Sequence, residues 1–186
     1  MDEKQQKNWY VMRSLFRTEL KMRAKLEAAN IESFVPTTSR LVVLHGRKKS
    51  IETPIVSNLI FVHSDTTTLQ PFLDRDSRFQ YIFVKGGKQH ERMVVRDEDM
   101  QNFIRAVEAY EKPLYFKPSE LELERGTHVR VIGGPLDGMT GVYLKVKGAR
   151  SKRLVVIIPD TLAVAVDVKA DLIEVIEELQ AIHPKR

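Results

Sequence analysis

The residue types that most often carry chemistry are spread through this sequence without forming a constellation. The five histidines do not stand at the short spacings typical of metal ligands, and cysteine is absent, which excludes thiolate sites and disulfides. No Gly-Lys-Ser/Thr phosphate loop or dinucleotide fingerprint occurs, and Gly86-Gly87-Lys88 is interpreted as a turn. We therefore predict no enzyme, no metal and no cofactor, and expect a protein that acts by binding.

Basic residues offer a different chemistry, contact with phosphate. Arg17, Lys21 and Lys25 recur at i, i+4 and i+8 and would form one edge of a helix. Arg47, Lys48 and Lys49 follow one another in a polar stretch that we interpret as an exposed hairpin tip. A solvated helix face and a solvated loop are the competing interpretations.

Composition bounds the class of protein. The 186 residues are 42% hydrophobic and 30% charged, which indicates a globular chain long enough for two domains. Residues 1–112 hold 19 Lys and Arg against 15 Asp and Glu, and residues 113–186 hold 11 against 10, so the excess of base lies mainly in the first half. No apolar run approaches the ~20 residues of a membrane span, and the N-terminus lacks an apolar signal core. We expect a cytoplasmic monomer without a membrane partner.

The glycine-rich stretch Gly126–Gly141 predicts the start of a small barrel. It opens with the short alternating strand of Val129 and Val131. A tight reversal should follow, and four residues are expected to make the turn: Gly134, Pro135, Gly138 and Gly141. Further β-rich segments are expected at 142–146, 154–158, 162–168 and 172–175.

The first half alternates extended and helical patterns. Thr18 should cap a helix that Asn30 ends in a left-handed conformation, and Thr66–Thr68 and Asp97 should cap two more. Extended segments are expected at 8–13, 33–44, 55–62, 79–84 and 91–95, with 45–54 as a polar connection. This order predicts a ferredoxin-like split β-α-β arrangement, an antiparallel sheet with helices on one face.

The resulting fold class is α+β in two domains. Residues 1–112 form the first domain, and 113–124, with Pro113 and Pro118, read as a semi-extended linker. The barrel should occupy 125–176 and a tail 177–186.

Several motifs resemble those of a known family. The pattern G-x-x-V-R-V-x-x-G-P-L-x-G-x-x-G-V from residue 126 resembles the KOW motif of SH3-like β-barrels. The segments WYV at 9–11, FVP at 34–36, NLIFV at 58–62 and IFVKGG at 82–87 resemble the N-terminal domain of NusG. The resemblance to the NusG family spans about residues 8–176. It implies a transcription elongation or antitermination factor that binds RNA polymerase through its first domain.

The resemblance also suggests a specialised member. The Pro-Gly-Tyr signature expected before Ile60 is missing, and the chain as a whole is similar to the UpxY-type antiterminators of capsular polysaccharide operons. A housekeeping NusG-type factor and an RNA-binding, ribosome-associated KOW protein are the alternatives. The second alternative predicts a strongly basic barrel, against which the net +1 of residues 113–186 argues.

The family implies an apolar depression that docks on the clamp helices of RNA polymerase. The residues that match it are Leu59, Phe61, Tyr81 and Phe83. Leu59 and Phe61 alternate onto one face, as do Tyr81 and Phe83, and core packing is the competing interpretation. Leu59 and Ser57 stand where the family usually has tyrosine and proline.

Two further contacts follow from the resemblance alone. Specialised relatives contact non-template DNA in the transcription bubble through the helix that carries Arg17, Lys21 and Lys25. The loops of the KOW barrel bind Rho or a small-subunit ribosomal protein. The matching positions here are Leu136, Pro159 and Leu162, where aromatic residues common in general factors are missing, which weakens the expectation of Rho binding. The barrel strands are rich in β-branched residues, so we expect a permanent barrel.

Overall fold

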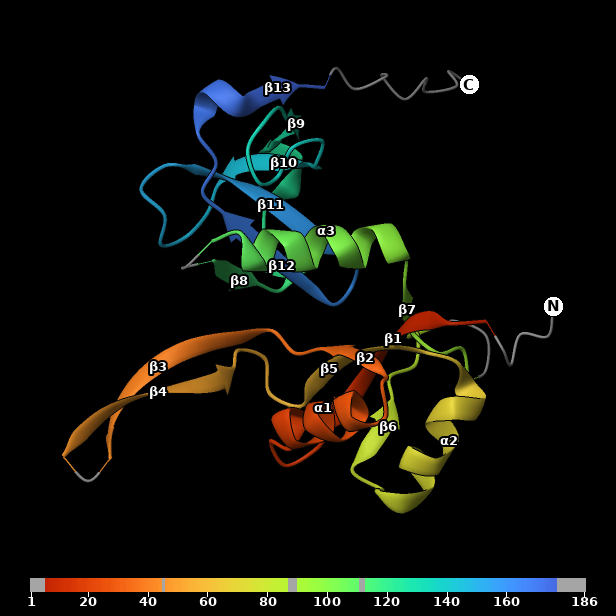
Figure 1. Ribbon diagram of the computed structural model, residues 1–186. Coiled ribbons are helices and arrows are strands. Elements are labelled where there is room, and N and C mark those ends of the chain that lie inside the picture. The colour runs from red at the N-terminus through yellow and green to blue at the C-terminus, as the bar shows by residue number, and fades with distance from the viewer. Residues whose placement is uncertain (1–5, 45, 87–89, 111–112, 177–186) are drawn as a thin grey trace, which may run out of the picture. The chain divides into compact units, whose positions relative to one another are not determined.

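The computed structural model describes residues 6–44, 46–86, 90–110 and 113–176. The chain forms two compact units, Met1–Asp97 and Glu98–Arg186 (Figure 1). The expected boundary after residue 112 therefore lies some way into the second unit. No helix in the described ranges is long and apolar enough to cross a membrane.

The first unit is built on an antiparallel sheet with two helices on one face. Its strands are β1 (Asn8–Ser14), β2 (Glu32–Phe34), β5 (Leu59–Ser64), β6 (Phe79–Tyr81) and β7 (Val94–Val95), in the order β2-β5-β1-β6, with β7 also paired to β1. The helices are α1 (Glu19–Ala28) and α2 (Thr66–Arg75).

The register of β1 and β5 decides which side chains meet the helices. Tyr10 lies opposite Val62 and Met12 opposite Ile60, and these side chains form one buried cluster with Met22 and Leu26 of α1 and Leu69 of α2. The alternate residues of the same strands, Val11 opposite Phe61 and Arg13 opposite Leu59, point to the other face.

The expected helix ends are partly right. Asn30 has φ 56°, the left-handed conformation predicted for it. Thr18 stands at the N-cap of α1, but its hydroxyl donates to the carbonyl of Leu15 at 2.7 Å and does not cap the helix. The cap of α2 is Asp65, whose carboxylate accepts the amide of Thr68 at 2.8 Å, so the expectation of a threonine cap was wrong.

The polar stretch 45–54, expected as a connection with an exposed hairpin tip, is mostly strand, because most of it forms the second strand of a hairpin. β3 (Thr37–Leu44) and β4 (Arg47–Pro54) form a separate two-stranded ribbon that extends from the rest of the first unit (Figure 1). Pairing runs from Thr37 opposite Pro54 to Leu44 opposite Arg47. The backbone hydrogen bonds of this ladder form even though β4 has no apolar alternation. The next strand consequently starts only at Leu59 and not at residue 55.

The second unit is built on a six-stranded antiparallel sheet. Helix α3 (Asp97–Glu108) begins where the first unit ends. The strands are β8 (Leu114–Phe116), β9 (Thr127–Val131), β10 (Thr140–Lys145), β11 (Lys152–Ile158), β12 (Leu162–Val166) and β13 (Ile173–Val175), in the order β13-β9-β10-β11-β12-β8. All five residues of β12 are buried, so both of its faces are covered.

The expected linker at 113–124 is part of this unit. Leu114 and Phe116 of β8 lie opposite Ala165 and Ala163 of β12, and Leu121 and Leu123 pack against the cluster that contains Val142. A strand of three residues followed by short 3-10 turns has no periodicity, which is why the sequence pattern resembles a linker. The predicted tail at 177–186 lies outside the described residues.

Candidate nucleic-acid and protein contact surfaces

The connection between β1 and α1 contains a strained turn. Phe16 has φ 60° and Arg17 has φ 56°, so two consecutive non-glycine residues adopt the left-handed conformation. This conformation costs roughly 1–2 kcal/mol per residue for an L-amino acid with a β-carbon. It persists only where the surrounding structure fixes it.

Asn58, the residue immediately before β5, provides much of that support. Its side-chain Oδ1 accepts the amide of Arg17 at 3.2 Å and its carbonyl accepts the amide of Ser14 at 3.1 Å. Asn58 is itself left-handed, with φ 64°. The amide of Leu15 donates to the carbonyl of Arg78 at 2.9 Å, so the turn is tied to the sheet on both sides.

A buried carboxylate lies beneath the turn. Glu19 is completely buried, and its Oε1 accepts the amide of Asn58. Its Oε2 has no hydrogen-bond partner within the described ranges. Glu19 therefore supports Asn58, which in turn fixes Arg17.

The predicted basic edge of α1 is exposed but not equally available. The side chains of Arg17 and Lys21 are exposed and form no ion pair or hydrogen bond with the part of the chain that the structure describes. Lys25 Nζ lies 3.6 Å from Asp76 Oδ2, and Arg78 Nε donates to Asp76 Oδ1 at 2.7 Å. The bond from Arg78 is the main reason that the pKa of Asp76 falls to about 2. The charge of Lys25 is therefore partly neutralised by the ion pair with Asp76.

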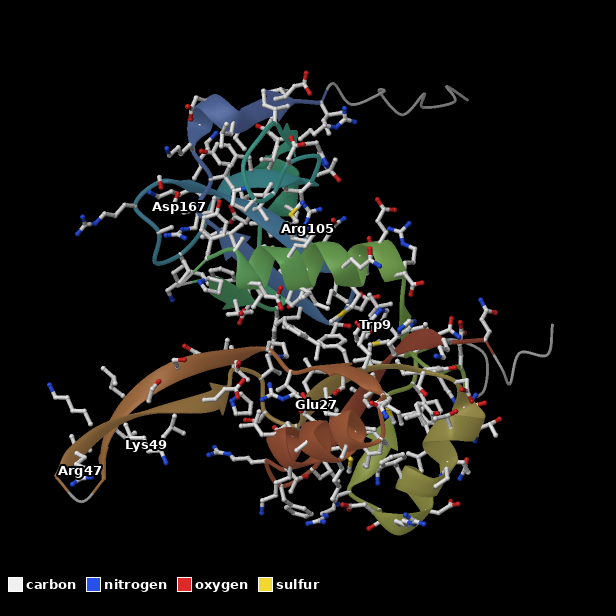
Figure 2. All side chains as sticks on the ribbon, in the orientation of Figure 1. Trp9, Glu27, Arg47, Lys49, Arg105 and Asp167 are labelled. Atoms are coloured by element: carbon white, nitrogen blue, oxygen red, sulfur yellow. The ribbon has the colours of Figure 1, made fainter. Side chains whose placement is uncertain are left out.

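The second basic group lies on β4, near the tip of the ribbon, where Figure 2 labels Arg47 and Lys49. Arg47, Lys48 and Lys49 are all exposed, and strand alternation puts Arg47 and Lys49 on one face and Lys48 on the other.

The base of the ribbon is pinned by two contacts. Arg23 of α1 binds Glu52 with both guanidinium nitrogens, at 2.9 and 2.7 Å, and the hydrogen bond lowers the pKa of Glu52. The amide of Ile55 donates to the carbonyl of Pro36 at 2.9 Å.

The four predicted polymerase-contact residues do not share one face. Leu59 and Phe61 lie on the face opposite α1 and α2 and are 7% and 0% exposed in the whole chain. Tyr81 lies opposite Met12 and packs against the core on the helix side. Phe83 is 48% exposed, with its ring 6.0 Å from that of His90.

Tyr81 has a structural environment. The guanidinium of Arg92 lies 4.9 Å from the centre of its ring, and its hydroxyl is buried without a hydrogen-bond partner among the described residues. Burial raises the pKa of Tyr81 to about 12. These contacts indicate core packing for this residue.

The glycines of the turn in the second unit are needed for two different reasons. Gly134 and Gly138 have φ 73° and 77°, as turn residues should, and the amide of Gly138 donates to the carbonyl of Val131 at 2.8 Å. Gly141 differs, since it lies within β10 and a β-carbon there would stand 2.6 Å from the carbonyl oxygen of Val155. Its expected role as a turn maker was therefore wrong, and strand approach is what excludes a side chain.

The predicted partner loops of the second unit are largely covered. Leu136 and Leu162 are 1% and 3% exposed, whereas Pro159 is exposed. Arg105 of α3, labelled in Figure 2, donates to the carbonyls of Pro135 and Asp137 at 3.2 and 3.3 Å. The tip of the β9–β10 loop is therefore held by α3 within this unit.

No group of three or more His, Cys, Asp or Glu side chains within the described ranges could hold a metal ion. The described surfaces include cationic edges, exposed aromatic groups and apolar strands, which are suited to binding.

Comparison with known families decides the class of protein. Residues 7–120 match the family described as NusG, transcription termination factor. The chain belongs to the NusG family. This is a non-enzymatic family of transcription elongation and antitermination factors, and its members bind RNA polymerase.

The NusG-family chain is also similar to a solved structure described as "Domain interaction in Thermotoga maritima NusG". The two share 21% identity over 92% of this chain and 98% of the other, with a TM-score of 0.49. The comparison with curated proteins gave no match.

One exposed residue escaped the sequence patterns. Phe16 is 78% exposed and directly precedes the predicted basic edge at Arg17. The signal in the sequence is an aromatic residue in the connection between a strand and a helix, where neither period accounts for it.

Proposed function

We propose that this chain is a transcription elongation and antitermination factor that binds RNA polymerase through its first unit and suppresses pausing or termination. The observation that carries the proposal is the family match over residues 7–120, which includes every strand and helix of that unit. The first unit would act as the ferredoxin-like N-terminal domain of the family.

The proposed polymerase contact is the face of the sheet opposite the helices, at Leu59 and Phe61, together with the exposed ring of Phe83. Tyr81 is left out because it packs on the helix side. Leu59 and Phe61 are 7% and 0% exposed in the whole chain and would support this part of the sheet, while Phe83, 48% exposed, would supply apolar surface for the clamp helices to bury.

A charge reversal at an exposed position of that face tests the contact without disturbing the core. Arg13 is exposed and lies opposite Leu59, so Arg13→Glu should fold and should reduce recovery of RNA polymerase in a pull-down by about tenfold or more. Arg75→Glu, on the exposed side of α2, is the matched control and should leave recovery unchanged. If both variants recovered RNA polymerase equally, the contact would not lie on the face opposite the helices.

The second unit is proposed to be an SH3-like KOW barrel that recruits a protein partner, a small-subunit ribosomal protein or Rho. The near-neutral charge of residues 113–186 supports a protein partner over ribosomal RNA. A pull-down distinguishes the alternative, because recovery of ribosomal RNA without polymerase would identify a ribosome-associated RNA-binding protein.

We further propose that the basic edge of α1 contacts non-template DNA in the transcription bubble. Arg17 and Lys21 are the main candidates because Lys25 also faces Asp76. Lys21→Glu should reduce crosslinking to the non-template strand of an assembled elongation complex, with Arg75→Glu as control. Unchanged crosslinking of a folded Lys21→Glu variant would remove this contact. The basic residues at the ribbon tip remain a weaker prediction of the same kind.

A specialised role on long operons such as capsular polysaccharide loci is proposed on the missing Pro-Gly-Tyr signature before Ile60. The alternative is a housekeeping factor. Transcription of a long template with and without one defined leader sequence separates the two, since only a specialised factor should depend on the leader.

A further inference from the structure

We propose that the ring of Phe16 is a stacking platform for one unpaired base of single-stranded nucleic acid, with Arg17 and Lys21 contacting the flanking phosphates. The inference rests on the proposed contact of the first unit with non-template DNA. It adds the side chain that holds a base and the kind of interaction it makes.

The exposed ring of Phe16 stands on a strained backbone. Single exposed apolar side chains are common and need no explanation. Phe16, however, is 78% exposed on a turn in which both it and Arg17 are left-handed. The ring contributes little burial energy to the fold while its backbone carries strain. A left-handed pair without glycine, displaying an aromatic ring to solvent, fits a binding position better than a connecting one.

The backbone around the turn is held by hydrogen bonds within the first unit. The amides of Ser14, Leu15 and Arg17 each have an acceptor, and the hydroxyls of Ser14 and Thr18 lie 2.8 Å apart. A ring mounted on a fixed backbone loses little conformational freedom on binding. This geometry favours a preorganised stacking surface over a side chain that becomes ordered only when it binds.

The charges around the ring favour a polyanion. Arg17 is adjacent and Lys21 follows one turn along α1, and both are exposed without ion pairs in the described ranges. Two carboxylates of this unit are occupied or buried: Asp76 binds Arg78 and Lys25, and Glu19 faces Asn58 inside the protein.

An exposed aromatic ring beside free cations is the combination that binds single strands, because the ring stacks on a base while the cations follow the backbone. In a duplex the base faces are already stacked, so the ring would find no partner. The proposed ligand is therefore single-stranded and not duplex nucleic acid.

Fluorescence anisotropy with the full chain and a labelled oligodeoxythymidine strand tests the proposal. Phe16→Leu keeps an apolar side chain without a π-face and should weaken binding by at least about fivefold. Phe16→Tyr keeps the π-face and should bind within about twofold of the wild type. Arg17→Gln should reduce the dependence of affinity on salt. Binding to the matching duplex should not respond to Phe16→Leu.

A second variant gives a direct optical readout. Trp9 is the only tryptophan and is 3% exposed, so its fluorescence should respond little to added single strand. Phe16→Trp places an exposed indole on the platform, and stacking on a base should quench its emission. The wild type is the matched control. Trp9 emission reports whether the variants that keep it as their only tryptophan are folded, and circular dichroism reports this for Phe16→Trp.

Three results would overturn the proposal: no binding of the wild type to the single strand, equal affinity of wild type and folded Phe16→Leu, or no quenching in Phe16→Trp. If Phe16→Leu lost polymerase recovery with unchanged strand affinity, the ring would belong to a protein contact instead. Failure at the single strand with normal polymerase recovery would refute the platform and leave the proposed function standing.

Discussion

The two units contain sharp reversals that meet the same backbone requirement in opposite ways. In the β9–β10 loop of the second unit, glycine occupies left-handed positions at Gly133, Gly134 and Gly138. In the β1–α1 turn of the first unit, Phe16 and Arg17 occupy them, with Asn58 left-handed beside them. Glycine removes the steric cost of positive φ, whereas a residue with a β-carbon retains it.

The difference shows what each reversal contributes. The glycine loop presents no side chain at its left-handed positions, so its task is to reverse the chain and place Leu136 in the interior. The β1–α1 turn keeps two side chains at some cost in stability, and both are directed to solvent. We infer that the β1–α1 turn serves binding and that the β9–β10 loop serves folding.

The largest effect expected is that of Gly141→Ala. The new β-carbon would stand 2.6 Å from the Val155 carbonyl oxygen and 2.9 Å from Leu154 Cδ1, so β10 and β11 would have to separate. We expect the free energy of unfolding of the second unit to fall by about 2–3 kcal/mol. Denaturant titration followed by circular dichroism measures the loss, and Trp9 fluorescence reports the first unit as a control. A stability equal to that of the wild type would show that the strands yield readily.

Glu19→Ala should have the next largest effect, this time in the first unit. It removes the acceptor of the Asn58 amide, and an unsatisfied buried donor costs about 1–3 kcal/mol. Urea titration followed by Trp9 fluorescence measures the change. Glu19→Gln keeps a carbonyl acceptor and should lose less. If both variants were equally unstable, the charge and not the hydrogen bond would be what supports the turn.

Gly138→Ala isolates the conformational cost at the glycine loop. A β-carbon there would meet nothing within 4 Å, so only the φ of 77° opposes it. A loss of about 1 kcal/mol is expected, smaller than that of Gly141→Ala. Thermal unfolding of both variants side by side gives the ranking, and the reverse order would contradict the assignment of the two glycines.

Phe16→Gly should produce the smallest change and the opposite sign. Relief of the left-handed strain outweighs the added freedom of the unfolded chain, so the first unit should gain about 0.5 kcal/mol. Single-strand binding should be lost at the same time. Urea titration with Trp9 fluorescence and the anisotropy assay measure the two quantities. A marked destabilisation would mean that the ring packs on the protein and that the contrast between the two reversals is false.

Local chemistry made part of this fold predictable. The helix predicted between Thr18 and Asn30 is α1, and the β-rich segment predicted at 162–168 contains strand β12. Asn30 was predicted to be left-handed because asparagine tolerates that region. In each case the signal and its structural consequence lie within a few residues.

The remainder depends on partners distant in sequence. The turn at Phe16 is fixed by Asn58, which lies 41 residues further along the chain from Arg17. Strand β4 of the ribbon is mainly polar, so alternation of hydrophobicity could not reveal it, and it forms through backbone pairing with β3. Tyr81 was grouped with Leu59 and Phe61, but the pairing with Met12 puts it on the other face. The register of a strand depends on its partner strand, so it cannot be predicted from one strand's sequence.

The way the ribbon is pinned has a consequence for proteolysis. Trypsin-type sites cluster at its tip, at Arg47, Lys48 and Lys49, while both strands are fastened at the base through Arg23–Glu52 and Pro36–Ile55. A single cut at the tip would leave β3 and β4 paired and both fragments attached to the sheet. The nicked protein would migrate as one species under native conditions and as two fragments once denatured.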